Sequence, residues 1–120
     1  MAAKAIILFG HGSRDPLWRQ PIEAVAARLA RAQPDVPVAC AYLELDTPDL
    51  ATAAAQLRAG GASAITIVPM FLGVGRHVRE DLPRLVDSLG RTHPEITLIL
   101  QPPVGEDARL LDLLVKIAMA

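Results

Sequence analysis

Residues 5–9 read Ala-Ile-Ile-Leu-Phe, and residues 10–14 read Gly-His-Gly-Ser-Arg. A continuous apolar run of this length predicts a strand that is buried on both of its faces, as the strands of parallel sheets are. The polar segment with its glycines predicts a loop directly beyond the end of that strand. Together the two segments predict a central strand whose carboxyl end leads into a histidine-bearing loop.

Helix-like and strand-like segments alternate along the rest of the chain. Further aliphatic runs predict strands, at residues 36–43, 63–70 and 96–100. Other segments carry apolar residues at the spacing of an amphipathic helix, at residues 16–32, 47–59, 79–89 and 106–119. The apolar face of the last of these consists of Leu110, Leu113, Leu114 and Ile117. The predicted order is therefore a strand followed by a helix, repeated along the whole chain.

Residues with special backbone preferences mark the ends of two predicted helices. Thr47 is the predicted N-cap of the second helix, with Pro48 at its first helical position. Gly60-Gly61 is expected to end that helix, and Gly90 to end the third. Pro83 falls early in the third helix, where a missing N–H costs least.

This alternation of strands and helices predicts a parallel sheet with helices on both faces. Because crossover connections between parallel strands are right-handed, few strand orders are possible. We expect a single flavodoxin-like α/β domain over residues 1–120, with a four-stranded parallel sheet in the order 2-1-3-4. The length fits one domain, and the chain contains no linker, low-complexity stretch or internal repeat.

The composition excludes several classes of protein. Hydrophobic residues make up 52% of the chain and charged residues 21%, which excludes an intrinsically disordered protein. A net charge of −1 argues against a nucleic-acid-binding protein. The apolar runs are too short to span a membrane, and we expect a cytoplasmic protein without a signal peptide. Cys40 is the single cysteine, so no intramolecular disulfide is possible, and we expect a small buried strand residue.

Reactive side chains follow three neighbouring strands of the predicted sheet. Ligands of open parallel sheets bind beyond the carboxyl ends of the strands, where the strand order reverses. The predicted order places His11 after the first strand, Glu44 after the second and His77 after the third at this edge. Two imidazoles and a carboxylate suit a divalent metal such as Co, Ni, Fe or Zn, and they leave room for a further ligand. The same groups can accept protons near neutral pH.

Other residues at this edge suit a large, planar ligand with several acidic groups. The predicted binding residues are three arginines and one aromatic residue, Arg14, Arg76, Arg79 and Phe71. Guanidinium groups match carboxylates in geometry and charge. Phe71 and Leu72 are expected to form an apolar lip, and the glycines beside His11 are expected to let a ligand approach the backbone.

Each of these residues also has a plainer interpretation. A histidine or glutamate after a strand is often a solvated loop residue, and His93, in a turn at the opposite edge, is expected to be structural or exposed. Residues 10–13 resemble a phosphate-binding loop only weakly, because the lysine and the third glycine are missing. A nucleophilic role for Ser13 lacks the G-x-S-x-G motif.

Three segments carry a resemblance to a known family. They are residues 6–14, residues 41–44 with Pro48, and residues 68–78 with residues 81–83. In order and spacing they resemble the short CbiX/SirB-type sirohydrochlorin chelatases, a family of class II tetrapyrrole chelatases, across nearly the whole chain. The third segment, Val-Pro-Met-Phe-Leu-Gly-Val-Gly-Arg-His-Val, is long and specific.

The resemblance implies a lyase that inserts a divalent metal into sirohydrochlorin. It implies Co²⁺ as the favoured metal substrate, with Fe²⁺ or Ni²⁺ as alternatives, and no redox cofactor. His11 and His77 match the family's metal-binding and proton-accepting histidines, and Glu44 matches the acidic residue beside them. Longer relatives carry two such α/β halves around one active site, so the resemblance implies that this chelatase half-domain forms a homodimer. Cobalt implies cobalamin synthesis, iron siroheme synthesis and nickel the synthesis of coenzyme F430.

Two other functions stay open at the level of sequence. A metal or tetrapyrrole carrier needs the same ligands but shows no turnover. A histidine phosphatase-like enzyme with His11 as its nucleophile usually carries an arginine directly before the histidine, where this chain has Gly10. Val74 and Arg76 stand where many members of the resembled family have smaller residues, which leaves the contacts on the substrate side open.

Overall fold

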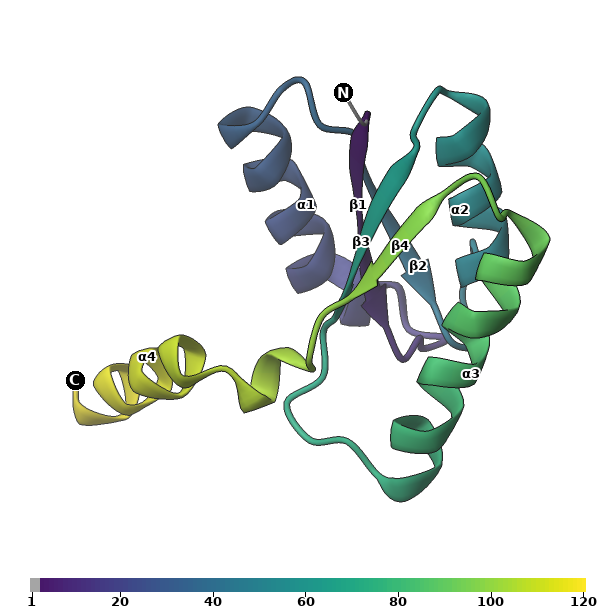
Figure 1. The fold of residues 1–120 in the computed structure, drawn as a ribbon. Helices are drawn as coiled ribbons and strands as arrows, with labels where there is room; N and C mark the ends of the chain where they lie inside the picture. The colour runs from purple at the N-terminus through teal and green to yellow at the C-terminus, as the bar shows by residue number, and fades with distance from the viewer. Residues whose placement is uncertain (1–2) are drawn as a thin grey trace.

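Four parallel strands form the central sheet of the protein in a computed structural model that describes residues 3–120 (Figure 1). The strands are β1 (Lys4–Gly10), β2 (Val38–Tyr42), β3 (Ala64–Pro69) and β4 (Thr97–Leu100). They lie in the order β2-β1-β3-β4, and all neighbours pair in parallel. The predicted strand order is therefore confirmed, and each predicted strand is present with slightly different ends.

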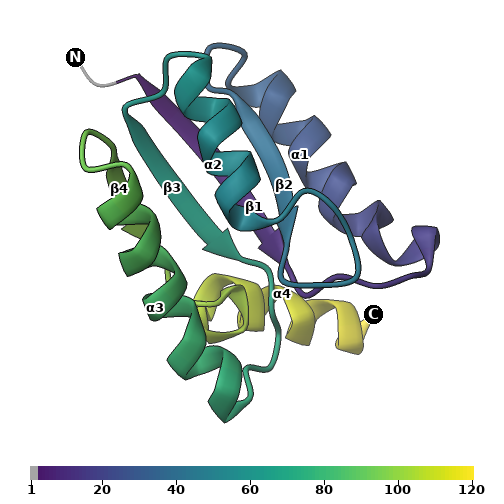
Figure 2. The same ribbon diagram turned by 90° about the vertical axis from the view of Figure 1, so that its right-hand side faces the viewer.

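The helices are arranged on both sides of this sheet. They are η1 (Pro16–Arg19), α1 (Gln20–Ala32), α2 (Leu50–Ala59), α3 (Arg76–Thr92), η2 (Val104–Glu106) and α4 (Ala108–Met119), where η denotes a short 3₁₀ helix. α1 lies on one face, and α2 and α3 lie on the other, as Figure 2 shows from the α2–α3 side. The prediction of helices on both faces is confirmed. Among the described residues, no helix is both long and apolar enough to cross a membrane.

Successive residues of the buried strands face two different core layers. Ile7 of β1 and Ile67 of β3 are completely buried in the layer beneath α2 and α3. Leu8 points the other way and packs against Ile22 of α1. Complete burial of one such side chain contributes about 1.5–3 kcal/mol. Cys40 lies in β2 as predicted, partly buried beside α1, and this burial raises the pKa of its thiol.

The third helix is longer than predicted at both ends. The sequence predicts a helix over residues 79–89, whereas α3 spans Arg76–Thr92 and continues through Gly90. Leu89 is buried against the sheet, and its packing outweighs the roughly 1 kcal/mol that a helical glycine costs. Pro83 consequently lies in the middle of the helix rather than near its start. In this position it removes one backbone hydrogen bond.

The second helix begins two residues later than predicted. Asp49 is its N-cap, with a carboxylate that accepts a hydrogen bond from the backbone N–H of Thr52 over 2.8 Å. Pro48 precedes the helix, and its carbonyl accepts a hydrogen bond from the backbone N–H of Tyr42. The predictions of Thr47 as N-cap and of Pro48 as a helical residue are therefore wrong, because this carbonyl is engaged with β2. The helix ends at the predicted Gly60-Gly61.

The last helix projects from the domain. The helix predicted over residues 106–119 begins two residues later, as α4 (Ala108–Met119), and η2 precedes it, whereas the predicted residues 16–32 divide into η1 and α1. Every residue from 111 to 120 is exposed to solvent, and Figure 1 shows α4 at the lower left, pointing away from the strands. Of the apolar face predicted for this helix, Leu113, Leu114 and Ile117 are exposed and Leu110 is partly buried.

Candidate functional site

The ends of β1 and β2 bring His11 and Glu44 together. The pairing of the two strands continues beyond their last residues, where the backbone N–H of Glu44 donates to the carbonyl of His11 over 3.0 Å. Nε2 of His11 lies 3.1 Å from Oε1 of Glu44. The side chains are 48% and 56% exposed, respectively. Two of the three predicted ligands thus meet in an open position at the carboxyl edge of the sheet.

Gly12 makes this contact possible. Its φ angle is +102°, which residues with a side chain rarely adopt. A Cβ atom at this position would overlap with the backbone carbonyl of Glu44. At Gly10, a Cβ atom would lie 3.2 Å from the ring of Trp18. The two glycines therefore make room for the protein's own side chains and backbone, rather than for a ligand as the sequence predicts.

Aromatic and charged side chains support the loops around the pair. Trp18 contacts Tyr42 edge-to-face, with ring centroids 6.2 Å apart. The guanidinium of Arg19 lies 3.4 Å from the carboxylate of Asp46. Burial raises the pKa of Tyr42 to about 12, and the nearby Cys40 and Asp46 add to this effect. The Tyr42 hydroxyl is therefore even less acidic than that of an ordinary tyrosine.

His77 lies apart from the other two predicted ligands. It belongs to the first turn of α3, whereas the sequence predicts it in a loop. Figure 1 shows the chain leaving β3 through a long loop and starting α3 well below the sheet. Within residues 3–120, no three His, Cys, Asp or Glu side chains lie close enough together to hold one metal ion. The structure therefore brings His11 and Glu44 together but leaves His77 outside the group.

The loop between β3 and α3 is attached to η2. The backbone N–H of Gly105 donates to the carbonyl of Phe71 over 2.9 Å. A Cβ atom at Gly105 would overlap with the backbone of Leu72. Beyond the loop, in the first turn of α3, Arg79 forms an ion pair with Glu106 of η2 at 3.1 Å. Contacts from η2 therefore restrain the loop on both sides.

Of the two residues predicted to form an apolar lip, only Leu72 is exposed, and Phe71 is buried. Phe71 is 9% exposed, and its ring packs edge-on against Phe9 with centroids 6.1 Å apart. The prediction of Phe71 as a surface binding residue is therefore wrong, because its ring fills the core layer beneath α3. Leu72 is 66% exposed and can contact a ligand.

The three predicted arginines differ in their partners. Arg14 and Arg76 are exposed, and within the described part of the chain neither forms an ion pair. Arg79 is engaged with Glu106. His93 caps the carboxyl end of α3 with its side chain 14% exposed, which agrees with the structural role predicted for it.

Three residues that shape the site are absent from the predicted set. Gly12 is visible in the sequence as part of Gly-His-Gly, but its contact with Glu44 requires the register of β1 and β2. Trp18, the single tryptophan, is conspicuous in the sequence, but its contact with Tyr42 depends on the fold. Gly105 has no sequence signal, because its partner is a loop more than thirty residues away.

The pair is a hydrogen-bonded imidazole and carboxylate, and its facing atoms are close enough together to bind one cation. Two ligand atoms 3.1 Å apart, with metal–ligand bonds of about 2.1 Å, form an angle of about 95° at the metal. That angle is close to the right angle between neighbouring ligands of an octahedral ion. In the absence of a cation, the same contact is a hydrogen bond between the imidazole and the carboxylate.

Comparison with known proteins shows similarity to members of one family. A sequence model of the CbiX family matches residues 5–118. The sirohydrochlorin cobaltochelatase of Methanococcoides burtonii is 30% identical over 122 residues, covering 95% of this chain and 93% of that protein. The sirohydrochlorin cobaltochelatase of Sulfolobus acidocaldarius is 30% identical over 109 residues, covering 91% of this chain and 85% of that protein.

Solved structures share the fold. A CbiX protein from Marinobacter aquaeolei VT8 is similar with a TM-score of 0.84 and 33% identity, covering 97% of this chain and 94% of that chain. The sirohydrochlorin chelatase SirB from Bacillus subtilis subspecies spizizenii, in complex with cobalt, is similar with a TM-score of 0.73 and 27% identity. That match covers 94% of this chain but 48% of SirB. The chain thus spans about half the length of SirB.

Proposed function

This chain belongs to the CbiX family, and from that membership we propose that it is a sirohydrochlorin chelatase, a lyase that inserts a divalent metal into the tetrapyrrole. Co²⁺ is the favoured metal, because relatives that match over nearly their whole length are named cobaltochelatases. Fe²⁺ is the second choice. The favoured context is accordingly cobalamin synthesis, with siroheme synthesis as the alternative.

The observation that carries this proposal is the contact between His11 and Glu44. Their facing atoms are 3.1 Å apart, a hydrogen-bond distance that is also short enough for both atoms to bind one divalent cation. Both side chains are about half exposed, so the other positions on the cation are open to water or to pyrrole nitrogens. An ion held in this way can leave the protein in every turnover, as a metal substrate must.

We assign His77 as the third ligand, delivered by a movement of the loop between β3 and α3. His77 is exposed in the first turn of α3. A Cβ atom at Gly73 or Gly75 would have no neighbour within 4 Å, so within the described residues this part of the loop is not packed against other side chains. Binding of the cation supplies the attraction that draws this turn towards His11 and Glu44.

The reaction exchanges two pyrrole N–H protons for one divalent ion. It needs proton acceptors, and it transfers no electrons while the metal stays divalent. As the ion moves to the ring, the imidazoles of His11 and His77 and the carboxylate of Glu44 become free to accept those protons. The protein contributes positioning of the two substrates and partial removal of water from the ion.

The acidic groups of the tetrapyrrole contact Arg14 and Arg76 in this proposal. Both guanidinium groups are exposed, and a guanidinium binds a carboxylate through paired hydrogen bonds. Arg79 is already bonded to Glu106, so we assign it mainly to restraining the loop. Leu72 offers an apolar contact to the flat face of the ring.

Two copies of the chain form the substrate cleft in this proposal. The half-exposed pair of His11 and Glu44 lies at an open edge of the single domain. SirB has about twice the length that this chain matches, so a second copy takes the place of its other half. Protein on both faces of the macrocycle excludes water from the metal as it transfers.

A turnover assay tests the proposed function. Purified protein is mixed with an excess of sirohydrochlorin and Co²⁺, and the absorption spectrum of the macrocycle reports metal insertion. We expect insertion faster than in the protein-free control over many turnovers. A single burst equal to the protein concentration would indicate a carrier, and a rate equal to the control would contradict the proposal.

Replacement of His11 tests the site within this assay. His11→Ala is expected to lower the rate by about 100-fold or more, because it removes a metal ligand and a proton acceptor. Its far-UV circular dichroism should match that of the wild type, since the side chain is half exposed. His93→Ala is the matched histidine control and should retain the rate. Unfolding of His11→Ala would assign this residue a structural role instead.

A further inference from the structure

Two ion pairs join the segment after β1 to the segment after β2. The outer pair is His11 with Glu44, whose side chains are 48% and 56% exposed. The inner pair is Arg19, at the end of η1, with Asp46. Nη1 of Arg19 lies 3.4 Å from both carboxylate oxygens of Asp46, whose side chain is only 10% exposed. The same two segments are thus linked once by exposed side chains and once through a largely buried carboxylate.

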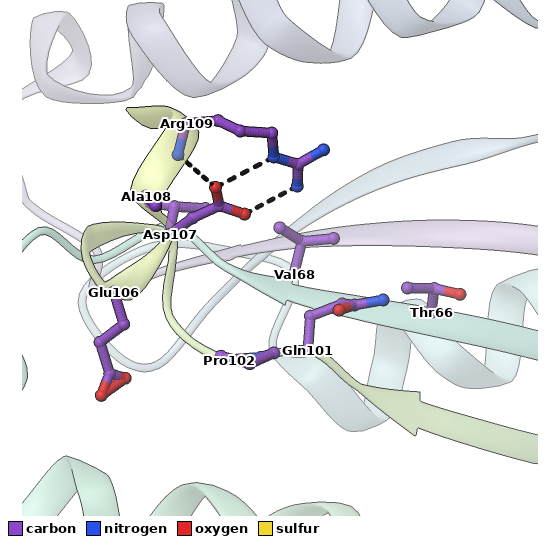
Figure 3. Close-up of a pocket in the computed structure, with 9 residues that line it drawn as sticks. Thr66, Val68, Gln101, Pro102, Glu106, Asp107, Ala108 and Arg109 are labelled. Atoms are coloured by element: carbon purple, nitrogen blue, oxygen red, sulfur yellow. Dashed lines mark hydrogen bonds and ion pairs between the residues drawn. The ribbon is translucent and has the colours of Figure 1, made fainter. Parts of the chain in front are cut away.

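Burial of its carboxylate distinguishes the inner pair from the other ion pairs. Figure 3 shows one of these beside a cavity of about 480 Å³: Arg109 and Asp107, at the start of α4, whose side chains are 91% and 37% exposed. That pair joins residues two positions apart, whereas Arg19 and Asp46 are 27 positions apart. Among the ion pairs of residues 3–120, no carboxylate is less exposed than that of Asp46. Exposed pairs contribute little, but a buried charge that loses its partner is costly, so the inner pair can hold the two segments together.

A left-handed turn at Leu45 separates the two acidic residues. In an extended chain, Glu44 and Asp46 would point to the same side, because side chains alternate with a period of two. Leu45 has a φ angle of +64°, which residues other than glycine seldom adopt. With this turn between them, Glu44 is exposed beside His11, whereas the Asp46 carboxylate is largely buried. Strained backbone of this kind persists only where the surrounding contacts hold it.

Contacts on both sides hold the turn at Leu45. Before it, the backbone N–H of Glu44 donates to the carbonyl of His11 over 3.0 Å. After it, the Asp46 carboxylate contacts Arg19 and accepts a hydrogen bond from the backbone N–H of the next residue over 3.1 Å. The side chain of Leu45 itself is 52% exposed. The turn therefore depends on the contacts of Asp46 more than on the packing of Leu45.

The segment that leads from His11 to Arg19 is held by hydrogen bonds of its own. Oγ of Ser13 accepts a hydrogen bond from the backbone N–H of Asp15 over 3.1 Å, and the Asp15 carboxylate caps η1. Nε of Arg19 also contacts the carboxylate of Glu23, at 3.2 Å. Loss of the inner pair would therefore release Glu44 rather than His11.

We propose that Asp46 and Arg19 are positioning residues, which hold the Glu44 carboxylate against His11 through the turn at Leu45. This inference rests on the proposed function, because it assigns the two residues to the support of the metal-binding pair. In this assignment neither residue touches the metal or the tetrapyrrole. The inner pair fixes the loop, and the exposed outer pair stays free to exchange its hydrogen bond for a cation.

Amide hydrogen exchange in the metal-free protein tests the positioning directly. Asp46→Asn removes the charge but keeps an oxygen for the backbone N–H of Thr47. We expect the protection of the Glu44 amide to fall by about 10-fold relative to the amides of β3, because the loop opens more often. Glu23→Gln is the matched control, since it removes the other carboxylate from Arg19, and it should keep the wild-type protection. Unchanged protection in Asp46→Asn, or an equal loss in Glu23→Gln, overturns the proposal.

Removal of the cation gives a second variant of the inner pair. Arg19→Gln should lower the protection of the Glu44 amide by a similar factor, and Arg19→Gln/Asp46→Asn should lower it no further than Asp46→Asn, because the two residues act as one unit. The double variant buries no unpaired charge, so it decides the question even if Arg19→Gln does not fold. A greater loss in the double variant than in Asp46→Asn overturns the pairing.

Calorimetry with Co²⁺ alone tests the link to the metal. Asp46→Asn should weaken Co²⁺ binding by about 10-fold in the wild-type chain. In Glu44→Gln it should weaken binding by less than about 2-fold, because the residue that it positions is already lost. An equal loss in both backgrounds, or no loss in either, overturns the positioning role. A wild type that binds no Co²⁺ contradicts the proposed function, and the exchange experiment, which uses no metal, then still decides whether the inner pair holds Glu44.

Discussion

At the scale of single residues, the site depends on positions that carry no side chain. The imidazole of His11 and the carboxylate of Glu44 face each other because the chain after β1 runs alongside the chain after β2, and Gly12 lies against the backbone of Glu44. The left-handed backbone and the closeness of the Glu44 carbonyl both exclude a Cβ atom there. A functional pair at the surface thus depends on a buried glycine between the loops.

Gly12→Ala should lower the free energy of unfolding by about 2–4 kcal/mol, because it combines backbone strain with a steric clash. Urea denaturation measures the change. Gly73→Ala is the control: a Cβ atom there has no neighbour within 4 Å, so its stability should change by less than about 0.5 kcal/mol. Equal stability of Gly12→Ala and the wild type would show that Gly12 does not lie this close to the backbone of Glu44.

At the scale of elements, hydrophobic periodicity predicts which segments pack in or against the sheet. The aliphatic runs locate all four strands. Right-handed crossovers leave few strand orders, and the flavodoxin-like order expected among them is confirmed. Helix ends are less predictable, because several residues can serve as caps. Thr47 and Asp49 are both suitable N-caps, and the hydrogen bond from Tyr42 to the carbonyl of Pro48 selects the second. Local sequence patterns do not predict such contacts between separate segments of the chain.

Gly90 gives a test of the extended third helix. Gly90→Ala should raise the free energy of unfolding by about 1 kcal/mol, the helix-propensity difference between the two residues. The new Cβ would lie 4.0 Å from Leu98, an ordinary contact. Gly61→Ala should have the opposite effect, a loss of about 1–2 kcal/mol, because Gly61 has a φ of +106°. Destabilisation by Gly90→Ala, measured by urea denaturation, would argue that α3 ends earlier.

The cap of α2 predicts a pH dependence of stability. Hydrogen bonds from Thr52 hold the pKa of Asp49 below its ordinary value of 3.8. The ionised cap therefore contributes its full stabilisation above pH 3.8, and the contribution is lost as pH falls towards the lowered pKa, because the unfolded chain takes up the proton first. Asp49→Asn keeps a cap without this titration.

Urea denaturation of both proteins between pH 6 and pH 3 measures the effect. Below about pH 4, the free energy of unfolding of the wild type should fall more than that of Asp49→Asn. Other carboxyl groups titrate equally in both proteins and cancel in the difference. A stability difference between the two proteins that stays constant over this pH range would show that the Asp49 carboxylate does not cap α2.

At the scale of the whole molecule, the sequence predicts the edge of the sheet that carries the chemistry but not the distances across it. His11 and Glu44 meet because adjacent strands fix their spacing. His77 follows the correct strand, yet its position depends on a loop restrained by η2. The sequence likewise predicts the apolar face of α4 but not its exposure, because hydrophobic periodicity does not show whether a helix packs against the sheet.

Counting the imidazole ligands of bound cobalt tests the central claim most directly. Co²⁺ is added to the protein at less than one equivalent, and X-ray absorption spectroscopy counts the imidazole nitrogens around it. The account predicts two imidazoles in the wild type, two in His93→Ala, and one in either His11→Ala or His77→Ala. A single imidazole in the wild type, or two in His77→Ala, would contradict the convergence of His11 and His77 on one cation.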